Sequence, residues 1–179
     1  MASKIFNESE RQSLKSLHTE ISHEDLITYF TFSSRDIEQI KSHKGQGNRL
    51  GFAIQLGVVR YLGIALDDFS CVPENIVEIV SKQIGISDSK GLIKSYGSRE
   101  HTRTDHLKEI IDYLNFRKPN KKDISKISEW LLERALEHNN LKLIFTMACE
   151  KLHNEKILRP GISILERIIS KARQKAQQE

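Results

Sequence analysis

The stretch SREHTRTDHLKEIIDYLNF, Ser98 to Phe116, is predicted to form one helix in which a single stripe changes chemistry halfway along. At about 100° per residue, four residues fall within roughly 60° of one another, namely Arg99, Arg103, Ile110 and Leu114. Burying two guanidinium groups costs free energy unless they are paired. We therefore expect the cationic first half to project beyond the core, as do helices that enter a groove of DNA.

Around this helix, start and stop signals for helices recur along the chain, and no segment alternates strictly enough to be a strand. We predict an all-α fold made of tandem small helical bundles of helix-turn-helix type, followed by further helices. Capping patterns at Asn7, Ser22 and Ser33 mark the first three starts. The predicted helices cover residues 8–17, 23–30, 34–43, 45–63, 73–84, 88–96, 98–116, 124–138, 141–157 and 161–179.

The helix predicted at Gly45–Gly63 contains two internal glycines, Gly51 and Gly57. Glycine inside a helix costs about 1 kcal/mol relative to alanine. We interpret both glycines as points of close contact between helices rather than as a phosphate-binding loop. Gly63 is placed to end this helix, which we expect to form the centre of a bundle.

Three regions are predicted along the chain. Residues 1–66 form a first helical DNA-binding bundle, residues 67–118 a second bundle of helix-turn-helix type, and residues 119–179 a basic linker and a helical segment leading to a next domain. The segment RKPNKKD, residues 117–123, is interpreted as a linker because it holds a proline and four basic residues. The last helix is expected to pack through an apolar face, and its polar end, residues 170–179, to fray.

The net charge of +4 is unevenly distributed. Residues 1–86 hold 9 basic and 11 acidic side chains, residues 87–122 hold 9 and 5, and residues 123–179 hold 10 and 8. A local basic patch is the electrostatic footprint of a polyanionic partner, although charge runs also occur on ordinary solvated surfaces. The charge distribution alone is therefore compatible with a nucleic-acid partner but does not select it over a solvated surface.

DNA binding needs cations that anchor phosphates and a few side chains that reach base edges. For base contacts, the first half of the helix at 98–116 offers Arg99, Thr102, Arg103, Asp105 and His106. For phosphate contacts, we select Lys94, Lys108, Arg117, Lys118, Lys121 and Lys122. A similar group surrounds the start of the helix at 45–63 and comprises Lys41, Lys44, Gln46, Asn48 and Arg49.

A structural role is the alternative for the arginines. Arg49 and Arg60 lie on one side of their helix and could pair with acidic residues while burying only their stems. We favour this interpretation for Arg60. For Arg99 and Arg103 we favour DNA contacts, because the stripe switches from cationic to apolar.

No pattern predicts catalysis. His101 and His106 are five residues apart, and the chain lacks HExxH, GxSxG and GxxxxGK. Cys71 and Cys149 have neither metal-binding nor disulfide spacing. We therefore expect no catalytic residue, no metal and no cofactor. Because no signal peptide or long apolar run is visible, we also expect a cytoplasmic protein without a membrane partner.

Four segments carry a family resemblance. They are IFNESERQSL at residues 5–14, TFSSRDIEQIKSHKG at 31–45, NRLGFAIQLGVVRYLG at 48–63 and the helix at 98–116. In this order they resemble the N-terminal region of replicative transposases of the Tn-three family. In that family the region is helical and is similar to tandem helix-turn-helix modules that bind the terminal inverted repeats of a transposon.

The resemblance implies sequence-specific binding of double-stranded DNA at transposon ends. In the family, strand transfer belongs to a larger C-terminal region with an RNase-H-like core and a magnesium-binding DDE triad, which this sequence lacks, so we expect no catalysis by this chain. Homodimerisation through a full-length protein stays open.

The competing hypothesis is a helical protein-interaction or dimerisation module, with residues 123–179 offering an apolar face. It predicts association that is insensitive to salt, whereas DNA binding is steeply salt-dependent. An enzyme such as a nuclease ranks third among the hypotheses, because the sequence shows no cluster of acidic residues that could hold the metal ions such an enzyme uses.

Overall fold

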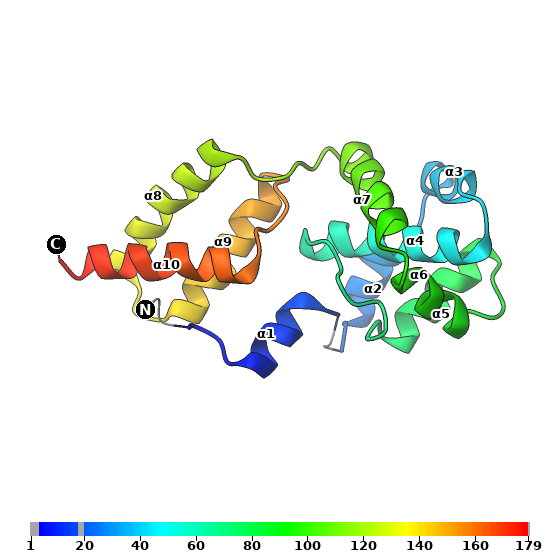
Figure 1. Ribbon diagram of the computed structural model, residues 1–179, viewed down its shortest axis with the longest axis horizontal. Helices are drawn as coiled ribbons and strands as arrows, with labels where there is room; N and C mark the ends of the chain where they lie inside the picture. Colours follow the sequence, from blue (N-terminus) through cyan, green and yellow to red (C-terminus); the bar gives the residue numbers. More distant parts are fainter. Residues whose placement is uncertain (1–3, 18–19, 179) are drawn as a thin grey trace. The chain divides into compact units, whose positions relative to one another are not determined.

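The computed structural model describes residues 4–17 and 20–178, and the regular structure in these ranges is helical (Figure 1). One isolated bridge, between Arg117 and Ile157, is the exception. The all-α prediction is confirmed. The helices are α1 (Glu8–Lys15), α2 (His23–Phe30), α3 (Ser34–Ser42), α4 (Gln46–Leu62), α5 (Glu74–Ile84), α6 (Lys90–Gly97), α7 (Glu100–Leu114), α8 (Lys121–Glu137), α9 (Leu141–Asn154) and α10 (Ile162–Ala176).

Local capping chemistry explains most helix ends. The side chain of Asn7 accepts from the Glu10 N–H, and Ser22 caps α2 in the same way. Ser33 forms the predicted capping box with Asp36 at the start of α3. At the C-terminal ends of α4 and α5, Gly63 and Gly85 adopt the left-handed conformation that favours glycine.

Several predicted boundaries differ from the structure, among them the end of α9, which lies at Asn154 rather than at residue 157. Helix α6 begins at Lys90 rather than near residue 88. Helix α8 begins at Lys121, so the second half of the predicted linker 117–123 is helical. The reason is a second capping box, in which Asn120 accepts from the Asp123 N–H and Asp123 accepts from the Asn120 N–H.

The helices form two compact units. One contains residues 13–115 and is called here the α2–α7 unit; the other contains residues 1–12 and 116–179 and is called the α8–α10 unit. The boundary that we predicted near residue 66 therefore lies inside the α2–α7 unit. The reason is that α4 packs against α5, α6 and α7 as well as against α2 and α3.

Helix α4 is the centre of the α2–α7 unit (Figure 1). Every residue from Leu50 to Val59 is buried, which gives this helix contacts around its whole circumference. Gln55 is buried too, and its side chain bonds the Ile64 carbonyl oxygen and the Leu66 N–H. These bonds satisfy the backbone of the segment after Gly63, which has no helical period of its own.

A buried polar network joins three helices of the same unit. Arg60 on α4 donates two hydrogen bonds to Asp36 on α3, at 2.9 and 2.7 Å, and Tyr113 on α7 donates a third at 2.7 Å. The structural role predicted for Arg60 is confirmed. Burial alone would raise the pKa of Asp36, but hydrogen bonds from Arg60, Tyr113 and the Ser33 N–H outweigh it and lower the pKa to about 2.

In the α8–α10 unit, α10 packs on α8 and α9 through its apolar face, as predicted. The buried carboxylate of Glu166 on α10 accepts hydrogen bonds from the Ile5 and Phe6 N–H groups and from Arg11. The polar end that we expected to fray is helical as far as Ala176. Arg173 anchors it by donating to the Ala135 carbonyl oxygen at 2.9 Å.

Candidate nucleic-acid interface

Two pairs of helices in the α2–α7 unit are joined by tight turns. Helices α3 and α4 are connected by His43, Lys44 and Gly45, and Gly45 has a φ of +88°. Helices α6 and α7 are connected by Ser98 and Arg99. Short turns of this kind, often with a glycine, connect the helices of helix-turn-helix motifs. The second helix of each pair is one whose start we predicted to contact DNA.

The starts of these two second helices lie together. Arg99, which precedes α7, donates to the side-chain oxygen of Asn48 in the first turn of α4 at 3.3 Å. Gly47 lies beside Leu92 of α6, because a Cβ atom added at Gly47 would be in van der Waals contact with the Leu92 carbonyl oxygen at 3.6 Å. The sequence placed the two groups in separate bundles, and the contact between Asn48 and Arg99, 51 positions apart, has no local signal. The structure brings them together in one unit.

Lysines in the adjoining segments are free to bind anions. Lys41 at the end of α3, Lys44 in the turn and Lys94 on α6 are exposed, and within residues 4–17 and 20–178 none of them forms an ion pair. Gln46 is also exposed. Lys108 differs, because its ammonium lies 3.9 Å from the Asp105 carboxylate on the solvated side of α7. Such an exposed pair contributes little and is easily exchanged for a phosphate.

Other predicted contact residues shape the site. Arg49 is half-buried and donates from Nε to the His43 carbonyl oxygen at 2.8 Å. Asn48 donates to the Lys44 carbonyl oxygen at 3.0 Å. Both bonds brace the turn between α3 and α4. Thr102 is half-buried in the first turn of α7.

The first half of α7 does not project beyond the core as we expected. Arg103 is half-buried, and its Nη1 donates to the Asp67 carbonyl oxygen at 3.0 Å. It also lines a small cavity of about 160 Å³ together with Gln55 and Leu66. The segment after α4 folds back against this face of α7. The guanidinium group is therefore accommodated by a backbone carbonyl rather than by solvent alone.

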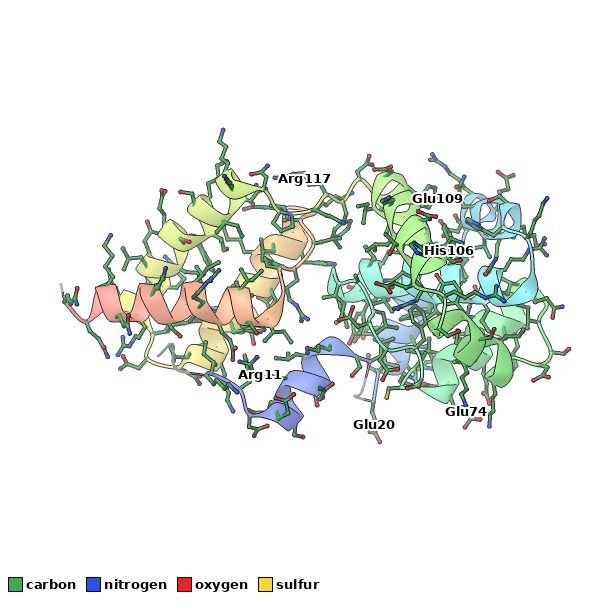
Figure 2. The ribbon with its side chains drawn as sticks, in the orientation of Figure 1. Arg11, Glu20, Glu74, His106, Glu109 and Arg117 are labelled. Atoms are coloured by element: carbon green, nitrogen blue, oxygen red, sulfur yellow. The ribbon has the colours of Figure 1, made fainter. Side chains whose placement is uncertain are left out.

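His106, which we predicted to contact DNA, is buried in the helix packing (Figure 2). Its Nδ1 shares a hydrogen bond of 2.9 Å with the Tyr96 hydroxyl, and its ring contacts the rings of His43 and Phe52. Burial, followed by the nearby His43, lowers the pKa of His106 to about 4. The sequence signal was its spacing of four residues from Ile110, which places it on the apolar stripe.

We expect His106 to make the α2–α7 unit sensitive to acid. Its folded pKa of about 4 lies below the ordinary 6.5, so between these pH values the unfolded chain binds the proton first. Stability is therefore fully present above pH 6.5 and falls as the pH is lowered toward 4. Urea unfolding at several pH values should show this slope, and His106→Gln should flatten it. An unchanged slope in the variant would assign the effect to other groups.

The remaining predicted cations belong to the α8–α10 unit. Arg117, labelled in Figure 2, donates from Nη1 and Nη2 to the two carboxylate oxygens of Asp123, and the bond from Nη2 is 2.7 Å long. These hydrogen bonds hold the pKa of Asp123 well below its usual range. Lys118, Lys121 and Lys122 are exposed and have no ion-pair partner in the described part of the chain.

Among the described residues, no group of His, Cys, Asp and Glu side chains is arranged to hold a metal ion. None of the helices in residues 4–17 and 20–178 has the length and apolarity needed to cross a membrane.

Comparisons with known proteins agree with the resemblance found in the sequence. The family described as "Domain of unknown function (DUF4158)" matches residues 5–172. The chain is 36% identical over 154 residues to the transposase for transposon Tn1546 of Enterococcus faecium, an alignment that covers 86% of this chain and 15% of that protein.

Two further relatives are also transposases. Identity is 34% over 168 residues with the transposase for transposon Tn501 of Pseudomonas aeruginosa, covering 94% of this chain and 17% of the relative. It is 32% over 155 residues with the transposase for transposon gamma-delta of Escherichia coli strain K12, covering 86% and 15%. The resemblance to transposases is confirmed, and this chain spans 15–17% of the length of these relatives.

Proposed function

Because this chain belongs to the family described as "Domain of unknown function (DUF4158)", we propose that it is a transposase module that binds double-stranded DNA at the terminal inverted repeats of a transposon. Its relatives are transposases, which act on DNA ends. The module recognises the repeat and carries out no catalysis. Strand transfer is assigned to other parts of a longer protein, as the family resemblance implies.

The contact between Asn48 and Arg99 carries this proposal. It joins the starts of α4 and α7 into one polar surface, with an amide and a guanidinium group side by side. Arginine recognises guanine through paired hydrogen bonds in the major groove, and the bond to Asn48 uses a single donor of the exposed Arg99 guanidinium group. Lys41, Lys44 and Lys94 supply charges for the phosphates on either side of the bases.

The test compares a duplex that carries the inverted repeat flanking the gene of this chain with a scrambled duplex of the same composition. Fluorescence anisotropy gives the affinity for both at two salt concentrations. We expect the native chain to prefer the repeat, and Arg99→Ala to reduce this preference by about tenfold, since one good base contact contributes about 1–3 kcal/mol. Both affinities should fall steeply with salt.

Lys90→Ala is the matched control, because Lys90 is an exposed cation on α6 that pairs with Glu74 at 2.7 Å. It removes the same charge from the same unit and should leave the preference unchanged. Equal affinity of the native chain for both duplexes would refute recognition of the repeat. Association that needs a protein partner and does not respond to salt would favour the interaction-module hypothesis instead.

A further inference from the structure

The two structural units carry opposite net charges. The α8–α10 unit holds 16 Lys and Arg against 10 Asp and Glu, a net charge of +6. The α2–α7 unit holds 12 against 14, a net charge of −2. The unit with the candidate base-reading helices therefore repels a polyanion at long range, while the other unit attracts it. The net positive charge of the chain therefore resides in the α8–α10 unit.

Three cations of this unit lie along one face of α10. Arg167, Lys171 and Lys175 are spaced four residues apart, so they form a stripe along the helix. All three are exposed, and none forms an ion pair with another described residue. They line one side of a groove of about 370 Å³ between α10 and α8.

The other side of the groove is formed by α8. Ile124, Ser128 and Leu132 lie along it, and Glu129 is its single acidic residue. Lys121, three residues before Ile124, is an exposed cation in the first turn of α8. The groove thus has three cations along its α10 wall. Spaced cations of this kind bind the phosphates of a nucleic-acid backbone.

The apolar side chains that α10 contributes to the groove are nearly buried, since Ile168 and Ala172 are only 8% and 7% exposed. The large apolar side chains that are exposed in the described residues, Ile27, Leu136, Leu143 and Ile164, lie outside the groove lining. Protein docking sites have an apolar centre with charge at the rim. On the α10 wall of this groove the exposed residues are the three cations, which favours a negatively charged ligand.

We propose that this basic groove of the α8–α10 unit, lined by Arg167, Lys171 and Lys175, binds the sugar–phosphate backbone of double-stranded DNA without reading its sequence. This inference rests on the proposed function and divides it between the units. The α8–α10 unit supplies sequence-independent affinity, and the start of α4 and α7 supplies the preference for the repeat. The division explains how a unit with a net negative charge can contact DNA.

The test uses the 179-residue chain with Arg167, Lys171 and Lys175 all changed to Gln. Anisotropy with the repeat and scrambled duplexes is measured across a series of salt concentrations. Each lost phosphate contact removes about 0.9 from the slope of log affinity against log salt. We therefore expect the slope to become shallower by about 2.7 for both duplexes. The ratio of the two affinities should stay unchanged, because these side chains read no bases.

The control variant changes Lys82, Lys90 and Lys126 to Gln. It removes the same charge from exposed positions outside the groove, so a similar loss of slope in this variant would overturn the proposal. If the groove variant kept both the native ratio of affinities and the native salt slope, the groove proposal would be overturned and the proposed function would stand. No binding of either duplex by the native chain would refute both. Thermal unfolding followed by circular dichroism verifies that both variants fold.

Discussion

Asp36→Ala is expected to lower the free energy of unfolding by about 3 kcal/mol, the lower end of the range for breaking a buried ion pair. The Asp36 carboxylate is 4% exposed, and it is the common acceptor for Arg60, Tyr113 and the Ser33 N–H. Its removal leaves a guanidinium group and a hydroxyl without their partner and also breaks the capping box of α3. A quarter of the Arg60 side chain stays exposed, which limits the loss.

Urea unfolding at pH 7, followed by circular dichroism, measures this effect. Glu38→Ala is the matched control, because Glu38 is an exposed acid on the same helix, and it should change stability by less than about 0.5 kcal/mol. Tyr113→Phe removes a single hydrogen bond and should cost about 1 kcal/mol. If Asp36→Ala were no worse than Glu38→Ala, the network would contribute nothing to the packing of α3, α4 and α7.

The features predicted correctly from the sequence are those set by neighbours in the chain. A capping box needs only residues three positions apart, so Ser33 and Asp36 could be recognised directly. The close helix contacts expected at Gly51 and Gly57 are also confirmed, because an unfavourable glycine inside a helix is a signal that the local sequence shows directly. The start of α8 was predicted too late because Pro119 led us to assign residues 117–123 to a linker. The capping box of Asn120 and Asp123 is an equally local signal for the true start.

The features that sequence reasoning missed depend on contacts between distant residues. Glu166 binds the backbone of Ile5 and Phe6, about 160 positions away, so the start of the chain belongs with its end. A division into consecutive domains could not represent this arrangement. It also hid the charge asymmetry, because residues 87–122 combine parts of both units. Only the fold shows that the cations of the α8–α10 unit outnumber its acids by six.

His106 illustrates a second reason for failure. A histidine at a helical spacing from Ile110 is compatible with both a core position and a DNA contact. Tyr96 decides between them, since its buried hydroxyl needs a partner and His106 provides it at 2.9 Å. The expectation that Arg103 projects beyond the core is wrong for a related reason. Arg103 donates to the Asp67 carbonyl oxygen, and Asp67 lies in a segment whose sequence has no helical period.

Gly57→Ala tests the packing of α4 at its tightest point. A Cβ atom at Gly57 would lie 2.3 Å from two ring carbons of Phe30, which is fully buried. Alanine raises helix propensity by about 1 kcal/mol, whereas overpacking a core costs typically 1–3 kcal/mol and sometimes more. Because Phe30 is 0% exposed, its ring cannot move aside into solvent, so we expect the overlap to dominate and the stability to fall by about 2 kcal/mol.

Two comparisons separate overlap from other effects of the substitution. Gly91→Ala lies on α6 with nothing within 4 Å of the added atom, so it should stabilise the protein slightly through propensity alone. Phe30→Leu removes the ring that the new methyl group would meet. In that background Gly57→Ala should cost at least 1 kcal/mol less, because residues in contact are not additive. Equal costs in both backgrounds would mean that α4 and α2 do not approach as closely at Gly57 as the packing described here requires.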